Sequence, residues 1–174
     1  YNRQYGKSHN IDYRCIMPTN LYGPHNSYDT KNSHVIAALI DRFHKAKVNN
    51  LSEVIIWGTG EPRREFLYVD DMTRAAVYIM NLSKKIYTEK TTPMCSHINV
   101  GYGTDLTIKD LANSIREIVN FKGVINFDPA QPDGTPRKLL DSQILNNFDF
   151  KPEVDLKEGL IKTYQDYLKN NANH

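Results

Sequence analysis

The sequence predicts an α/β protein, in which strands and helices alternate along the chain and pack in layers. Short apolar runs that end in turns rich in glycine, proline or asparagine predict strands, as at 11–17 and 124–127. Apolar residues at helical spacing predict helices, as over 33–47 and 107–119. With 174 residues, the chain is long enough to bury a sizeable core.

The first elements are a helix end, a strand and a helix. Residues 1–6 resemble the end of a helix capped by Gly6. Because the chain begins with tyrosine rather than methionine, we expect it to be the C-terminal part of a longer protein. The apolar run 11–17 predicts a buried strand, and the helix over 33–47 follows it.

Two strands are predicted within 54–69, over 54–57 and 64–69, on either side of a Gly-Thr-Gly turn. This arrangement predicts a hairpin. Asp70 or Asp71 is then expected to cap a helix over about 71–83.

The C-terminal part predicts a strand at 98–101 and a helix that begins at Thr107. Asp155 and Glu158 have the spacing of a capping box and predict the last helix. Residues 169–174 are expected to fray. The inward side of the last helix is expected to consist of Leu160, Ile161, Tyr164 and Leu168.

Composition excludes several classes of function. The 22 basic and 20 acidic residues leave a net charge of +2, which gives no general case for binding nucleic acid or a membrane surface. Cys15 and Cys95 are too far apart to suggest a disulfide framework, so we expect a reducing, cytoplasmic setting. No apolar run approaches the length of a membrane span.

The turn that begins at Pro18 follows a predicted strand, where ligands dock in α/β sheets, although an ordinary loop has the same composition. Trp57 and Arg64 flank the next turn and would face each other across a hairpin. An indole beside a guanidinium suits a nucleotide, because the ring can stack and arginine can bind phosphate oxygens. The alternative is a core tryptophan and a surface arginine.

His34 precedes an apolar helix face and has a pKa suited to proton transfer, although it could equally be a structural or capping histidine. Arg42 lies two turns further along the same helix. Asp133 could accept from ribose hydroxyls, or it could belong to a solvated turn. Asp70 and Asp71 lack further residues at ligand spacing, so we expect no metal site.

Common catalytic motifs are absent from the sequence. It has no Gly-x-Gly-x-x-Gly loop, P-loop, zinc spacing or Gly-x-Ser-x-Gly elbow. It also has no Tyr-x-x-x-Lys pair of the reductase type.

Several motifs nevertheless run in order along nearly the whole chain: YNRQYG, MPTNLYGPH, NSHVIAALI, WGTGEPRREFLYVDDM, SHINVGYGTDLTI and PDGTPRKLLD. Together they closely resemble the C-terminal part of the GDP-L-fucose synthases, a branch of the extended short-chain dehydrogenase/reductase family. The MPTNLYGP segment is shared broadly among nucleotide-sugar epimerases and dehydratases. The motifs NSHVI, WGTG-x-x-x-REFL-x-VDDM and PDGTPRK are more specific to the fucose synthase branch. Residues 7–10 form an insertion relative to the common pattern.

The resemblance implies a two-part architecture. Residues 1–23 would be the last helix end, strand and turn of a Rossmann domain that binds NADP(H). Residues 24–174 would form mainly a smaller mixed α/β substrate-binding domain, with 54–83 and 98–101 returning to the Rossmann sheet. The full-length protein would be a homodimer.

The resemblance also implies roles for particular residues. The nicotinamide side of the cofactor would be lined by Pro18, Thr19, Asn20 and Leu21. His34 would contact both cofactor and substrate and act as the acid of epimerisation. Contacts to the GDP-sugar substrate would come from Arg42, Trp57, Arg64 and Asp133.

The implied enzyme converts GDP-4-keto-6-deoxy-D-mannose to GDP-L-fucose by 3,5-epimerisation and then 4-keto reduction. We expect this chain to supply the substrate-binding part and to be inactive alone, because it lacks the Tyr/Lys pair. The alternatives are another nucleotide-sugar epimerase or dehydratase of the same family, or a non-catalytic fragment that binds a nucleotide sugar or a partner.

Overall fold

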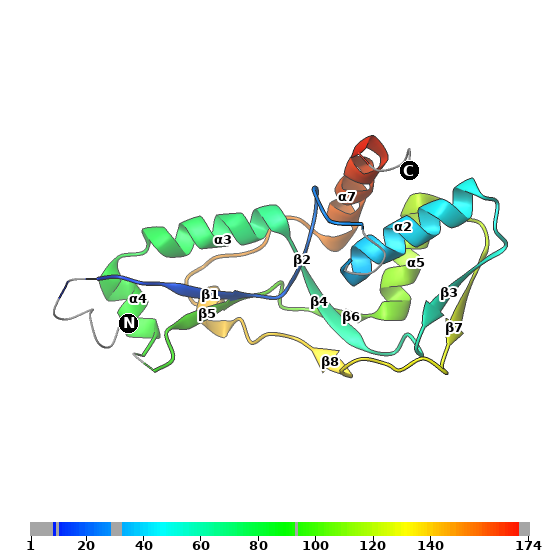
Figure 1. Cartoon of the computed structure of the whole chain (residues 1–174). Coiled ribbons are helices and arrows are strands. Elements are labelled where there is room, and N and C mark those ends of the chain that lie inside the picture. The colour runs from blue at the N-terminus through cyan, green and yellow to red at the C-terminus, as the bar shows by residue number, and fades with distance from the viewer. Residues whose placement is uncertain (1–8, 10, 29–32, 93, 171–174) are drawn as a thin grey trace.

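The computed structural model describes residues 9, 11–28, 33–92 and 94–170. It confirms the α/β fold class: small sheets alternate with helices along an elongated molecule (Figure 1). The helices α3 and α4 lie beside β1 and β5 at one end, and α2 and α5 lie beside β3 and β7 at the other. None of the helices in these residues combines the length and apolarity that crossing a membrane requires.

The strands of the described residues form three separate groups, and each group contains at least one parallel pair. The first group is β1 (Cys15–Pro18) with β5 (His97–Val100). The second is β2 (Asn20–Tyr22), β4 (Arg63–Tyr68), β6 (Asp105–Thr107) and β8 (Arg137–Lys138), in which only the β4–β6 pair is antiparallel. The third is β3 (Glu53–Trp57) with β7 (Val124–Asp128).

The helices include those predicted from periodicity. Thr107 and Asp155 cap two of them as expected, because Thr107 Oγ1 accepts from the Asp110 backbone N–H at 3.0 Å and Asp155 Oδ1 accepts from that of Glu158 at 2.8 Å. The helices are α2 (Val35–Val48), α3 (Val69–Asn81), α4 (Lys84–Lys90), α5 (Ile108–Val119), α6 (Gln143–Asn146) and α7 (Leu156–Asn170).

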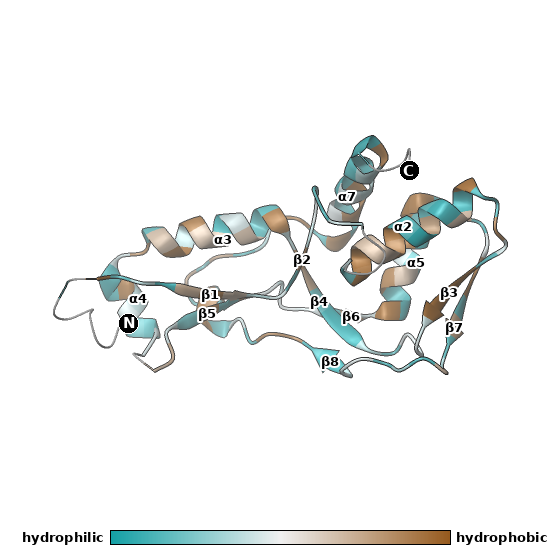
Figure 2. Cartoon of the chain, viewed as in Figure 1, coloured by the Kyte–Doolittle hydropathy of each residue, from teal (hydrophilic) through white to brown (hydrophobic). Residues whose placement is uncertain are grey.

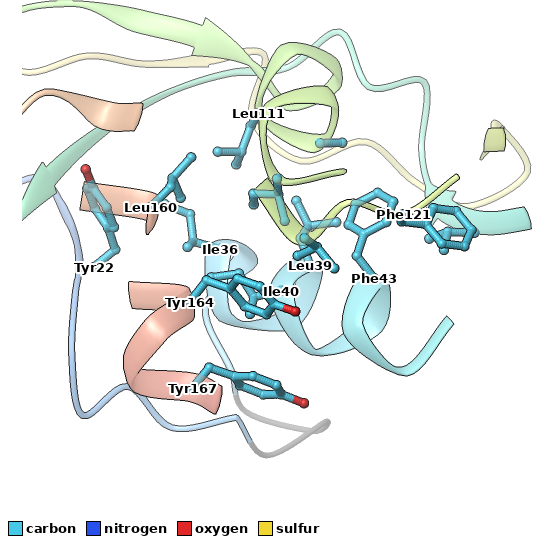
Figure 3. Close-up of a cluster of buried hydrophobic side chains, with 14 of the residues drawn as sticks. Tyr22, Ile36, Leu39, Ile40, Phe43, Leu111, Phe121, Leu160, Tyr164 and Tyr167 are labelled. Carbon is cyan, nitrogen blue, oxygen red and sulfur yellow. The ribbon is translucent and has the colours of Figure 1, made fainter. Parts of the chain in front are cut away.

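Two hydrophobic cores hold the molecule together. The larger joins α2, α5 and α7 to β3 and β4, and Figure 3 shows Phe43, Leu111 and Leu160 among its side chains. The smaller joins α3, α4 and α6 to β4 and β5. In Figure 2 the β3 ribbon is hydrophobic whereas β8 is hydrophilic, so the two strands face different surroundings.

The hairpin predicted over 54–69 is wrong. Strand β3 pairs with β7, and β4 lies between β2 and β6 in another sheet. Gly58 and Gly60 between them have φ values of 80° and 81°, in the left-handed region that glycine tolerates best. The turn therefore carries the chain from one sheet to the next instead of folding it back.

The burial predicted for two elements is wrong in part. In β1, Cys15 and Met17 are exposed whereas Ile16 packs against the smaller core, because successive side chains of a strand point to opposite faces. In α7, Leu160 and Tyr164 are buried as predicted, but Ile161 and Leu168 are 38% and 42% exposed, and Thr163 and Tyr167 face the core. The predictions for the helix end at 1–6, for most of the insertion 7–10 and for the tail after Asn170 lie outside the described residues.

The predicted cap of α3 is wrong as well. The helix begins at Val69, with Tyr68 at the cap position and no capping side chain. Asp71 is buried instead, and its carboxylate accepts from the backbone N–H groups of Glu153 and Val154, each at 3.0 Å, and from Arg74 at 2.6 Å. This carboxylate therefore ties the segment before α7 to α3.

Replacing Asp71 by asparagine is expected to lower the free energy of unfolding by about 2–3 kcal/mol, because the amide N–H₂ would face a buried N–H donor. Urea unfolding monitored by circular dichroism measures the change. The neighbouring exposed Asp70→Asn serves as the control and should change stability by less than about 0.5 kcal/mol. Equal stability of the two variants would contradict this role of Asp71.

Candidate ligand-binding site

A cavity of about 220 Å³ lies between α2, the ends of β3 and β4, and the loop before β8. A second cavity, of about 600 Å³, shares Ala38 and Arg42 with it, and this volume is in the range typical of small-molecule sites. The first cavity is lined by Val35, Ala38, Leu39, Arg42, Ile56, Trp57, Gly60, Pro62, Arg64, Ile108, Pro132, Asp133 and Gly134. The four side chains expected to contact substrate, Arg42, Trp57, Arg64 and Asp133, are therefore all in its wall.

Trp57 is the last residue of β3, and it is not a core residue. The side chains of Val54 and Ile56 point into the larger core, so the alternation of the strand turns Trp57 outward. Its side chain is 68% exposed. An indole this exposed in a cavity wall offers a flat apolar surface for a planar ligand.

Arg64 is held at the edge of the cavity by backbone carbonyls. Its Nη1 donates to the carbonyl oxygens of Arg63 at 2.8 Å and of Thr135 at 2.6 Å. The side chain therefore fastens the loop before β8 to β4, and it is not a freely solvated cation. A guanidinium has five N–H donors, so further donors remain for an anion.

Arg42 reaches the same cavity from α2. Val35, Ala38 and Arg42 follow one another at helical spacing and so share the face of α2 that lines the cavity. The Nη1 of Arg42 donates to the carbonyl oxygen of Ile55 in β3 at 2.7 Å. Two guanidinium groups, from different elements, thus border one small space.

Asp133 sits opposite α2 in the loop before β8. Its Oδ1 accepts from the Thr59 backbone N–H at 2.9 Å, and its Oδ2 accepts from the Thr59 hydroxyl at 2.6 Å. The loop is thereby joined to the Gly-Thr-Gly turn. Each carboxylate oxygen keeps lone pairs that can accept from a ligand hydroxyl.

Two neighbouring arginines share one carboxylate. Asp105 accepts from both Arg63 and Arg137, and these two arginines, Arg137 foremost, lower the pKa of its carboxyl group. The positively charged side chains in the lining of the smaller cavity are those of Arg42 and Arg64. Two guanidiniums beside an exposed indole suit a phosphorylated ligand with a flat ring.

His34 lies at the start of α2, directly before a residue of the cavity wall. Its backbone occupies the cap position, but its imidazole makes no capping hydrogen bond and is exposed. It does not line the cavity itself, although Val35 does. The capping role considered for this side chain is therefore excluded, and the ring is accessible.

The turn 18–21 lies apart from this cavity, where the chain passes from β1 to β2. The backbone N–H of Thr19 donates to the carbonyl oxygen of Val100 at 3.0 Å. The Thr19 hydroxyl and the Asn20 amide both donate to the carbonyl oxygen of Glu65, at 3.3 and 2.8 Å. These bonds fix the turn. None of its residues, 18–21, lines the smaller cavity.

Comparison with known proteins places this arrangement in a family. Residues 1–101 match the NAD dependent epimerase/dehydratase family, which is more than half of the chain. The chain belongs to this family. It is 52% identical over 170 residues to a GDP-L-fucose synthase of Escherichia coli, and the match covers 98% of the chain and 52% of that protein.

Solved structures of similar enzymes share the fold. A GDP-6-OMe-4-keto-L-xylo-heptose reductase from C. jejuni is 29% identical with a TM-score of 0.85, and the match covers 96% of this chain and 57% of that one. A GDP-mannoheptose C4 reductase from Campylobacter jejuni with NADP bound is 28% identical with a TM-score of 0.79, over 94% of this chain and 55% of that one. The chain spans about half the length of the curated relatives that it matches.

One central residue of this family member was missed by the sequence interpretation. Glu65 is completely buried in β4, and its carboxylate accepts from the backbone N–H groups of Gly103 at 2.7 Å and Leu140 at 3.1 Å. Gly101 lies so close that an added Cβ would be 2.4 Å from Oε1. A glutamate directly before Phe66 in a buried strand was the available signal, because buried carboxylates need such partners.

Proposed function

We propose that the protein to which this chain belongs converts GDP-4-keto-6-deoxy-D-mannose to GDP-L-fucose with NADP(H), and that this chain supplies the substrate-binding part. One observation carries the proposal: Arg42, Trp57, Arg64 and Asp133, which are far apart in the sequence, border one cavity. Support for the particular substrate comes from the 52% identity to a GDP-L-fucose synthase.

The cavity offers the groups that a nucleoside diphosphate needs. Arg42 and Arg64 would bind the diphosphate oxygens, since guanidinium groups match phosphate geometry through paired hydrogen bonds. Trp57 would pack against a planar part of the ligand, and Asp133 would accept from hydroxyl groups. Binding by these groups would hold the sugar in place for the chemical steps.

The cofactor would lie against Pro18, Thr19, Asn20 and Leu21, at the carboxyl end of β1. The fit is reasonable because the Asn20 amide uses one N–H on Glu65 and keeps its other N–H and its oxygen for a ligand. When bound, NADPH supplies hydride to C4 of the sugar. The turn contributes orientation, and its bonds to β4 hold it in position.

The pairing of the strands supports the proposed division of the chain into parts. Residues 1–23 and 98–101 would belong to a Rossmann sheet, which the parallel pairing of β1 with β5 supports. Helix α3, within 54–83, packs beside this pair in the smaller core. Strand β3 pairs with β7, so we now assign 54–57 to the substrate-binding part. A homodimer and a cytoplasmic setting complete the proposal. The two free cysteines are in keeping with a reducing setting.

During epimerisation a proton is removed from C3 and from C5 of the sugar, and His34 would donate the proton that replaces it at each carbon. In the full-length protein, His34→Ala is expected to slow epimerisation by about 10²- to 10⁴-fold, the usual contribution of a general acid. Solvent deuterium incorporation at C3 and C5 measures the step, and NADP(H) affinity should stay unchanged. His25→Asn, an exposed histidine of the same stretch, is the control. Incorporation at the wild-type rate in His34→Ala would end this assignment.

Isothermal titration tests the proposed substrate class. We expect saturable binding of GDP to the chain and much weaker binding of UDP. Equal affinity for both nucleotides would favour another nucleotide-sugar epimerase or dehydratase. Absence of any nucleotide binding would overturn the assignment of the cavity.

A further inference from the structure

The Gly-Thr-Gly turn after β3 is a rigid platform beside the cavity. The backbone N–H of Gly58 donates to the carbonyl oxygen of Asp128 at 2.9 Å. The carbonyl oxygen of Gly60 accepts from the backbone N–H of Lys109, also at 2.9 Å. Both glycines have the positive φ values that make this turn possible. The turn is therefore fixed to β7 on one side and to α5 on the other.

Thr59 lies between the two glycines, and its neighbours determine the direction in which its hydroxyl group donates. Its Oγ1 accepts from the backbone N–H of Glu61 at 3.2 Å, so its own proton is free to point to Asp133 Oδ2 at 2.6 Å. The Thr59 backbone N–H binds the other carboxylate oxygen at 2.9 Å. Both oxygens of Asp133 are thus held by a single residue, which fixes the plane of the carboxylate.

Close packing adds to this restraint. A Cβ on Gly58 would lie 2.2 Å from Asp133 Oδ1, so the carboxylate rests directly against the turn. Further along the loop, Arg64 donates to the carbonyl oxygen of Thr135 at 2.6 Å. The side chains of Thr59 and Arg64 therefore both fasten the cavity wall formed by the loop before β8, and the backbone N–H of Arg63 also donates to the carbonyl oxygen of Pro136 at 2.8 Å.

We propose that Thr59, which does not line the cavity, is a positioning residue that holds Asp133 and the loop before β8 in the geometry that binds ligand. The proposal deepens the proposed function and rests on it. The hydroxyl of Thr59 acts through Asp133 and touches no ligand. Loss of the hydroxyl would let the loop open more often and would leave the Asp133 carboxylate held by the Thr59 backbone N–H alone.

Two readouts test this role, and the first needs no nucleotide. Trypsin cleavage at Arg137 and Lys138 reports local opening of the loop and of β8 in the ligand-free chain. Thr59→Val keeps the branched shape and the backbone N–H but removes the hydroxyl, and it should speed cleavage by about tenfold. Thr59→Ser, which keeps the hydroxyl, should cleave at the wild-type rate.

The second readout is the dissociation constant for GDP. Thr59→Val should weaken binding about tenfold, Thr59→Ser should restore it, and neither should change the midpoint of thermal unfolding by more than a few degrees. In an Asp133→Ala background, Thr59→Val should have no further effect, because the two residues act as one unit.

Unchanged cleavage and unchanged GDP affinity in Thr59→Val would overturn the proposal, as would full additivity with Asp133→Ala. If Thr59→Val speeds cleavage while the wild-type chain binds no GDP, the restraint on the loop stands and the proposed function fails. The two failures are therefore distinguishable.

Discussion

Arg64→Ala is expected to weaken GDP binding by about 100-fold or more. The substitution removes a guanidinium from the cavity and also removes one of the bonds that hold the loop before β8, since Arg64 donates to the carbonyl oxygen of Thr135. Charge-assisted bonds from arginine to an anion are among the stronger polar contacts in proteins, so losing them together with the wall has a large effect. Titration calorimetry of the two proteins measures the change in dissociation constant.

Two further variants separate the causes. Arg64→Lys keeps the charge but loses the planar pair of donors, and it should recover only part of the affinity. Lys122→Ala removes a positive charge from an exposed position after α5 and should leave the affinity unchanged. If Arg64→Ala and Lys122→Ala bound GDP equally well, Arg64 would have no part in the site.

Glu65→Gln is expected to have the largest effect on stability, about 2–4 kcal/mol of the free energy of unfolding. The amide can accept through one oxygen only, so one of the backbone N–H groups of Gly103 and Leu140 would lose its acceptor inside the core. Urea unfolding provides the measurement.

The control is Glu61→Gln, an exposed glutamate four residues earlier that should shift stability by less than about 0.5 kcal/mol. If Glu65→Gln proves as stable as this control, the buried carboxylate does not link β4 to the two segments it contacts.

The elements that the sequence predicted well are those decided by local chemistry. Periodicity and capping residues place α5 and α7, and Thr107 and Asp155 make the bonds expected of them. The prediction of a hairpin was wrong because strand pairing depends on partners elsewhere in the chain. Strand β3 pairs with β7, which lies about seventy residues further along the sequence. A turn with two glycines predicts a change of chain direction, but it does not determine which strand the next one pairs with.

The candidate site shows the same limit. Trp57 and Arg64 were paired through a hairpin that does not exist, yet both lie in one cavity because α2 and the loop before β8 close around them. Asp71, Glu65 and Thr59 each bind residues distant in the sequence, so their roles could not be derived from local spacing. The resemblance to a family, rather than periodicity, supplied the nature of the ligand.

The fluorescence of Trp57 tests the central claim most directly, because the chain contains a single tryptophan and it stands in the cavity wall. We predict that GDP changes this emission in a saturable way, and that the change disappears in Arg64→Ala at the same nucleotide concentration. Emission that stays constant while calorimetry shows GDP binding would place the nucleotide elsewhere and contradict the account.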